Sequence, residues 1–217
     1  MNGAVLITGK QSGFTDDLVQ ETLNRQIPVC ATHDSQDTAP EVPDSSGDRL
    51  YYTPWSRRSL LSARSVMLTV AREYESLRHG IVVCSPEGVN EALHQTESAV
   101  IEERIDGALK GYLFILKELI AHLMRRGGGD CTIVWYDPGS EVMPPLDASV
   151  AGAVQGLVRS LLASYEGSPV TIRGLFASDA DSRGVARWVL EQSLDRPEKS
   201  AQRWQKYGQK GILPFRR

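Results

Sequence analysis

The stretch Ala4-Val5-Leu6-Ile7-Thr8-Gly9-Lys10-Gln11-Ser12-Gly13 decides the fold class of this chain. Its four consecutive apolar residues are typical of a strand buried on both faces, as in a parallel sheet. A polar turn with two glycines follows, and apolar residues at helical spacing from about Thr15 to Arg25 then predict a helix. A strand, a glycine turn and a helix in this order are typical of the start of a βαβ unit.

The same alternation continues along the chain. Apolar runs predict further strands at 28–31, 49–52, 81–84, 131–135 and 170–176, and a last short strand opening at Ile212-Leu213. Helical spacing predicts helices at 58–77 (closed by Gly80), 97–125 (stopped by the glycines at 127–129), 147–165 and 182–194. Strands joined by helices form parallel sheets through right-handed crossovers. We therefore expect one doubly wound, Rossmann-like α/β domain over residues 1–217, with helices on both faces of a parallel sheet.

Composition narrows the class of protein. The 217 residues are 41% hydrophobic and 24% charged, with a net charge of −3, which is typical of a globular protein and excludes a disordered chain or a basic nucleic-acid arm. We therefore expect no nucleic-acid partner. No apolar run is long enough to span a membrane, and the first residues do not resemble a signal peptide, so we expect a cytoplasmic protein.

Cysteines and histidines indicate no metal site. Cys30, Cys84 and Cys131 are widely spaced and odd in number, so we expect reduced thiols in apolar strands rather than a disulfide framework. The four histidines show no metal-ligand spacing, and we expect no metal ion.

The turn after the first strand is a candidate phosphate-binding loop. Gly9 and Gly13 would let the backbone approach a phosphate, and with Ser12 they lie where a helix N-terminus offers free N–H groups. His33 or Asp34 lies about 20 residues beyond Gly13, at the end of the second strand, where an acidic residue either accepts hydrogen bonds from a ribose or simply opens a polar loop. Gly9, Ser12, Gly13 and Asp34 are therefore candidate dinucleotide-binding residues.

Three nearby residues favour a purely structural turn instead. Thr15 stands where a third glycine would allow close contact between a cofactor and the helix. Asp16 and Asp17 follow in the first helical turn, where their charges would repel a pyrophosphate. Both interpretations of the turn stay open from the sequence.

Four stretches in a common register resemble the classical short-chain dehydrogenase/reductase family. The stretch 8–15 resembles its T-G-x-x-x-G-x-G turn, and 106–111 resembles the helix segment that normally reads Asn-Leu-x-Gly. Val158–Leu161 and Val170–Leu175 resemble the late part of the catalytic helix and the sixth strand. The resemblance covers residues 3–178 and implies a Rossmann-type sheet, an NAD or NADP cofactor and oxidoreductase activity.

The same register implies that the catalytic residues of the family are missing. The family uses Asn, Ser, Tyr and Lys to move a proton and hold the cofactor ribose. The corresponding positions here are Ala108, one of Val134, Trp135 and Tyr136, Asp147, and Ala151. No lysine lies between Lys117 and Lys199, so sliding the alignment restores no Tyr-x-x-x-Lys pair.

Two replacement acids can be considered. Asp147 at the tyrosine position is expected to be exposed and therefore ionised at pH 7. Tyr136 is expected at the end of the fifth strand, within reach of the old site. The family also carries a long substrate lid after the sixth strand, whereas only residues 179–181 separate that strand from the next helix here.

These observations favour a non-catalytic member of the family with a structural, regulatory or ligand-binding role and with residual dinucleotide affinity. An NAD(P)-dependent oxidoreductase with relocated catalytic residues is the alternative. In the family, the helices that correspond to 97–125 and 147–165 pair across a twofold axis. The small residues of the second helix here, Gly152 and Gly156 among them, favour the same homodimer or homotetramer.

Overall fold

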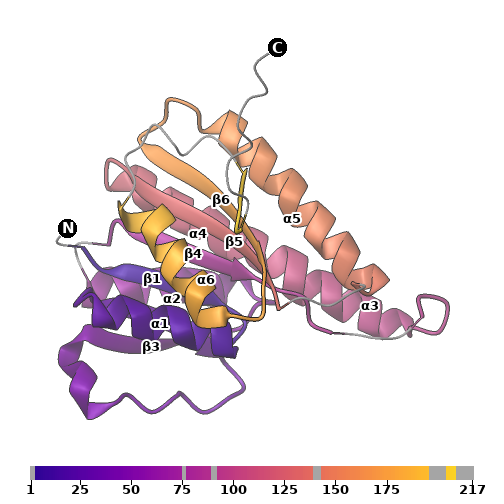
Figure 1. Cartoon of the computed structure of the whole chain (residues 1–217), viewed down its shortest axis with the longest axis horizontal. Coiled ribbons are helices and arrows are strands. Elements are labelled where there is room, and N and C mark those ends of the chain that lie inside the picture. Colours follow the sequence, from indigo (N-terminus) through magenta and orange to yellow (C-terminus); the bar gives the residue numbers. More distant parts are fainter. Residues whose placement is uncertain (1–2, 75–76, 89–91, 139–142, 196–203, 209–217) are drawn as a thin grey trace.

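The computed structural model describes residues 3–74, 77–88, 92–138, 143–195 and 204–208. They form a seven-stranded sheet in which every pair of neighbours is parallel, in the order β3-β2-β1-β4-β5-β6-β7. The strands are β1 Val5–Gly9, β2 Val29–Asp34, β3 Leu50–Trp55, β4 His79–Cys84, β5 Gly129–Asp137, β6 Val170–Ser178 and β7 Trp204–Lys206. The expected doubly wound parallel sheet is confirmed (Figure 1).

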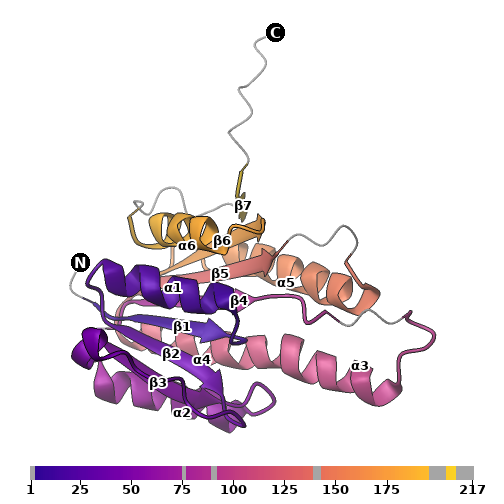
Figure 2. The ribbon, with the colours of Figure 1, turned by 60° about the horizontal axis from the view of Figure 1, so that its bottom comes forward.

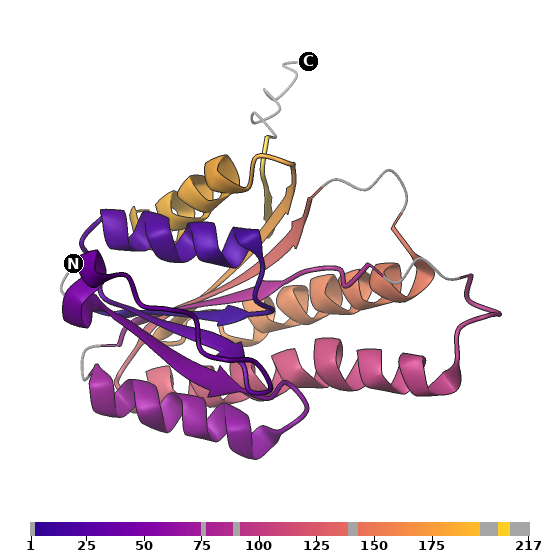
Figure 3. The same ribbon diagram turned by 90° about the horizontal axis from the view of Figure 1, so that it is seen from below.

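Helices cover both faces of the sheet. They are α1 Gly13–Asn24, α2 Leu60–Glu73, α3 Ser98–Arg104, α4 Gly111–Arg125, α5 Pro145–Ser164 and α6 Ser182–Leu190, with shorter segments η1 Asp44–Arg49, η2 Ile105–Lys110 and η3 Glu191–Asp195. Figure 3 shows α1 and α6 on one face and α2, α4 and α5 on the other. In Figure 2 the α3 end of the long helical run projects past the carboxyl ends of the strands.

The apolar runs of the strands explain this three-layer arrangement. Because side chains alternate along a strand, neighbouring residues enter opposite cores. Leu6 of β1 packs in the core beneath α2, α4 and α5, whereas Val5 and Ile7 pack in the core beneath α1 and α6. A run of consecutive apolar residues therefore serves both cores at once.

The chain order creates a crevice between β1 and β4. After β1 the chain moves outward through β2 and β3, then crosses to the other side of β1 to form β4. Connections on the two sides of this switch point leave in opposite directions, so the carboxyl ends of β1 and β4 form the place where open α/β sheets bind ligands.

Gly80 was expected to close a helix, and that expectation is wrong. The helix α2 ends at Glu73, and Gly80 lies inside β4. A Cβ atom at Gly80 would collide with the side chain of Leu119 on α4. The glycine therefore allows a helix to approach the sheet closely, a role that a sequence pattern does not distinguish from a helix stop.

Other boundaries differ from expectation in smaller ways. The long helix at 97–125 forms as one helical run but contains a π-helical segment, η2. The last described strand is β7, which pairs with β6 through Gly174 and Trp204, and the strand expected at Ile212-Leu213 lies outside the described residues. Within the ranges described above, no helix is both long enough and apolar enough to cross a membrane.

Candidate functional site

The glycine turn after β1 ends in a well-capped helix. Ser12 is the N-cap of α1, where its side chain accepts the N–H of Thr15 at 3.3 Å and the Thr15 hydroxyl accepts the N–H of Ser12 at 2.8 Å. This capping box explains why Thr15 replaces a third glycine. Gly13 is exposed and a Cβ atom there would meet nothing within 4 Å, so the space above the helix N-terminus is open.

Gly9 has a packing role. A Cβ atom at Gly9 would lie 2.6 Å from the carbonyl oxygen of Val83 on the neighbouring strand β4. The residue therefore lets β1 and β4 approach at the switch point, whether or not a phosphate binds above it.

The two acidic residues of the first turn of α1 have different surroundings. Asp17 accepts a hydrogen bond from the Ser182 hydroxyl and lies 3.8 Å from the guanidinium of Arg183, so it joins α1 to α6. Asp16 is an exposed residue, but neighbouring protein atoms keep some water away from its carboxylate. This partial burial of the carboxylate, followed by the nearby charge of Asp17, raises the pKa of Asp16.

Asp34 lines two cavities at the carboxyl edge of the sheet. A smaller cavity of about 110 Å³ is lined by Gly9, Lys10, Gln11, Asp34, Asp37, Trp55 and Arg57. A larger one of about 390 Å³ is lined by Asp34, Gln36, Ser56, Arg57, Arg58, Glu87, Val100, Glu103, Arg104 and Gly107. The structure thus brings Gly9 and Asp34 to one cavity, whereas neither cavity is lined by Ser12 or Gly13.

A cluster of charged side chains contributes to the lining of both cavities. The carboxylate of Glu87, in the loop after β4, lies 2.5 Å from the guanidinium of Arg57 and 3.9 Å from Lys10, and it contacts Arg104 directly. Burial alone would raise the pKa of Glu87, but the charge of Arg57, and those of Lys10 and Arg104 after it, hold that pKa below its ordinary value. Glu87 is therefore an anion at neutral pH.

Asp147 fixes the loop that carries Glu87. It lies in the first turn of α5, and its two carboxylate oxygens accept the backbone N–H groups of Glu87 at 3.1 Å and Gly88 at 2.9 Å. Only 3% of Asp147 is exposed, so the expectation of an exposed carboxyl is wrong. Two backbone donors that the loop leaves unpaired explain why an acidic residue is buried here.

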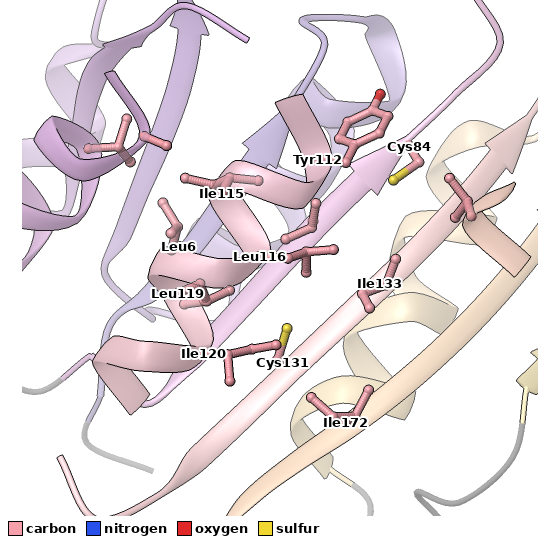
Figure 4. Packing of buried hydrophobic residues seen from close by; sticks show 14 of the residues in the cluster. Leu6, Cys84, Tyr112, Ile115, Leu116, Leu119, Ile120, Cys131, Ile133 and Ile172 are labelled. Carbon is pink, nitrogen blue, oxygen red and sulfur yellow. The ribbon is translucent and has the colours of Figure 1, made fainter. Parts of the chain in front are cut away.

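Three further residues that the resemblance aligns with the family's catalytic set, Trp135 being one of the three candidates for the serine position, have packing roles. Ala108, Trp135 and Ala151 are 3%, 0% and 7% exposed and belong to the core beneath α2, α4 and α5. Figure 4 shows part of this core, with Tyr112 of α4 beside Cys84 at the end of β4. The cavities described above are not lined by any of these residues.

Tyr136 lies on the opposite face of the sheet from Trp135. Its ring stacks on Phe14 of α1, with the ring centroids 4.0 Å apart, and its hydroxyl donates to the carbonyl oxygen of Asp179 at 3.0 Å. The expectation that Tyr136 reaches the side of Asp147 and Ala151 therefore does not fit its placement. Only residues 179–181 separate β6 from α6, and Asp181 already caps α6.

Sequence reasoning missed Glu87, Arg57 and Arg104. A signal for the first two exists, since charged residues soon after β3 and β4 lie at the binding edge of any doubly wound sheet. Arg104 gives no comparable signal, because it is one of several charged residues on a helix, and only the packing of α3 places it against the loop. The three cysteines are buried free thiols in β2, β4 and β5, as expected.

Comparisons with known proteins agree with this fold. No family model matches the chain. The NADP-dependent 3-hydroxy acid dehydrogenase YdfG of Escherichia coli O6:H1 is 23% identical over 158 residues, which are 71% of this chain and 62% of the length of YdfG. The match thus spans less than two thirds of that relative.

Two solved structures have closely similar folds at low sequence identity. A variant of ElxO with NADPH bound has a TM-score of 0.79 at 15% identity, covering 95% of this chain and 97% of its own. The 3-ketoacyl-(acyl-carrier-protein) reductase of Brucella melitensis, complexed with NADH, has a TM-score of 0.77 at 12% identity, covering 94% and 96%.

Proposed function

We propose that this chain, whose fold and sequence are similar to those of short-chain dehydrogenases/reductases, is a member of that family without hydride-transfer activity. Its role is to bind a ligand or a protein partner. The observation that carries this proposal is the position of Asp147, where the resemblance places the family's tyrosine. Both of its carboxylate oxygens bind backbone N–H groups of the loop after β4, so they are engaged in holding the fold together.

The tyrosines near this region support the proposal. Tyr136 uses its hydroxyl to bind the carbonyl oxygen of Asp179, on the face of α1 and α6. Tyr112 lies one helical turn after Ala108 but is 1% exposed, and burial raises its pKa. A substrate carbonyl has no access to a phenol in the apolar core, and general acid catalysis requires hydrogen-bond contact with the substrate.

The residues present fit only one part of a dinucleotide. Asp34 can accept hydrogen bonds from a ribose, and the open space above Gly13 leaves room for a phosphate at the helix N-terminus. No equivalent residue binds the nicotinamide end of the cofactor, because the resemblance places the family's ribose-binding lysine at Ala151, which is buried. When bound, NAD or NADP supplies or accepts a hydride. The side chains here would hold its ribose and phosphates without positioning a proton donor, so we expect weak binding and no turnover.

Calorimetric titration with NAD(H) and NADP(H), followed by turnover assays across carbonyl substrates, tests the proposal. We expect no reduction above the blank for the wild type, and no change in Tyr136→Phe or Asp147→Asn. Turnover that either substitution abolishes would contradict the proposal and favour an oxidoreductase with relocated residues. Asp34→Asn tests the proposed dinucleotide binding separately from catalysis. If the wild type binds a dinucleotide, this variant should bind it more weakly.

We also propose that two copies of the chain pair through α4 and α5. Gly152 and Gly156 lie on the exposed side of α5, and a Cβ atom at either would meet nothing within 4 Å. Leu113 of α4 is 42% exposed. Small residues permit close approach of a second helix, and an exposed leucine gains from being covered.

A further inference from the structure

Three cations from distant parts of the chain converge on one carboxylate. Lys10 belongs to the turn after β1, Arg57 follows β3 and Arg104 ends α3, and all three contact Glu87. The side chains of Arg57, Arg104 and Glu87 are 16%, 18% and 13% exposed. Such partial burial limits the screening by solvent that weakens ion pairs on a protein surface.

The cations in direct contact with the carboxylate outnumber it, because three positive charges face the single negative charge of Glu87. Asp34 and Asp37 on the cavity walls add two more negative charges nearby. Arg58 and Glu103, at the rim of the cavity, pair with each other. A convergent set of arginine and lysine donors is the arrangement that proteins use to bind phosphate groups, which carry more negative charge than a carboxylate.

The loop delivers this carboxylate into the set of cations. Asp147 binds the backbone N–H of Glu87, so the side chain starts from a fixed point next to the cavity. An internal group held in this way competes with a free ligand at a high effective concentration. The cavity of about 390 Å³ beside it is within the size range of small-molecule sites.

We propose that Lys10, Arg57 and Arg104 form a binding site for a phosphate-bearing small molecule, and that Glu87 occupies this site as an internal anion and keeps it closed. The inference concerns regulation of the same edge as the proposed function, and it rests on that proposal only for the location of ligand binding. A free phosphate group enters the site only when the Glu87 carboxylate is displaced or neutralised.

Calorimetric titration with inorganic pyrophosphate tests the inference on the full chain. We expect Glu87→Gln to bind pyrophosphate at least about tenfold more tightly than the wild type, because the amide keeps the size of the side chain and the backbone N–H but removes the competing charge. Glu87→Asp, which keeps the charge but shortens its reach, should show a smaller gain of about threefold, and it serves as the readout if Glu87→Gln does not fold.

Two further variants make the test specific. Asp106→Asn is the control, because it removes one negative charge close in sequence to Arg104 but outside the cluster around Glu87. Asp106 pairs with the exposed Lys110, so this variant should bind pyrophosphate as the wild type does. The double variant Glu87→Gln/Arg104→Gln should lose most of the gain, because one of the three cations is gone. Equal affinity of wild type and folded Glu87 variants, or an equal gain in Asp106→Asn, would overturn the inference while leaving the proposal of a non-catalytic protein unaffected.

Discussion

The carboxylate of Asp147 accepts the backbone N–H of Gly88 at 2.9 Å and so ties the start of α5 to the loop after β4. The same side chain accepts the N–H of Glu87, the residue on which three cations converge. One buried acid thus determines the shape of the loop at the switch point of the sheet. This pair of hydrogen bonds therefore forms a structural clamp between α5 and the loop.

Replacing Asp147 should destabilise the fold. In Asp147→Ala two partly buried N–H groups lose their acceptor. An unsatisfied buried donor costs about 1–3 kcal/mol and water can reach the exposed Gly88, so we expect a total loss of about 1–3 kcal/mol. Asp147→Asn should lose less, because its amide oxygen can keep one of the two bonds. Urea denaturation measures both, with the surface variant Asp106→Asn as a control that stays within about 0.5 kcal/mol of the wild type. A similarly small change in Asp147→Ala would refute the clamp.

Two glycine-to-alanine substitutions in helices should have opposite effects. At Gly111 a Cβ atom would lie 2.6 Å from the carbonyl oxygen of Arg57, so Gly111→Ala must displace backbone and should destabilise by about 1–3 kcal/mol. At Gly152 no atom of the same chain lies within 4 Å, so in a dilute, monomeric sample Gly152→Ala should stabilise the single protomer by about 0.5–1 kcal/mol through helix propensity. Thermal and urea unfolding of the two variants should therefore shift in opposite directions.

Stability should fall on mild acidification. Burial lowers the pKa of His79, with Asp130 opposing and Arg173 reinforcing the effect, and burial followed by two neighbouring arginines lowers the pKa of His122. Both histidines therefore bind protons less readily in the folded chain than in the unfolded chain, where the pKa is about 6.5. Their contribution to stability is complete above pH 6.5 and is lost as the pH falls through their folded pKa values.

Melting temperatures between pH 8 and pH 5 measure this dependence. The double variant His79→Gln/His122→Gln should show a flatter profile than the wild type, whereas His94→Gln at an exposed turn should leave the profile unchanged. A wild-type melting temperature that is constant from pH 7 to pH 5 would contradict the expectation.

Assembly through α4 and α5 can be tested with a bulky charge. Light scattering coupled to size exclusion should give the mass of a dimer or tetramer for the wild type. Gly152→Arg/Gly156→Arg should give a monomer, because two long charged side chains separate the helices. Gln20→Arg on the exposed side of α1 is the matched control and should leave the mass unchanged. A monomeric wild type would exclude the proposed pairing.

The order of strands and helices was predictable because a strand that is buried on both faces needs a run of consecutive apolar residues. Val5, Leu6 and Ile7 enter two different cores, so each strand requires consecutive apolar residues, and such runs are easily recognised. The helix end near Gly127 was also predictable from local sequence. Gly127 has a φ of 79°, and glycine adopts such a positive φ after a helix more readily than other residues do. The role of Gly80 was not, because it depends on Leu119 of a distant helix.

The candidate site was predictable only in part. Asp34 was found because it ends a strand at a fixed distance from the glycine turn, and it does line both cavities. The expectation of an exposed Asp147 failed, because its burial depends on the loop after β4 folding back over the start of α5. Whether Gly9, Ser12, Gly13 and Asp34 bind a dinucleotide remains a prediction.

By itself the sequence determined the α/β class, the parallel sheet and the lack of a lysine between Lys117 and Lys199, because periodicity and composition are local properties of a chain. Only the tertiary structure decided that Tyr136 and Trp135 face opposite cores, and that Lys10, Arg57, Glu87 and Arg104 meet at one point. Contacts among residues so far apart in sequence depend on how strands order and helices pack, and no pattern in a single segment encodes that arrangement.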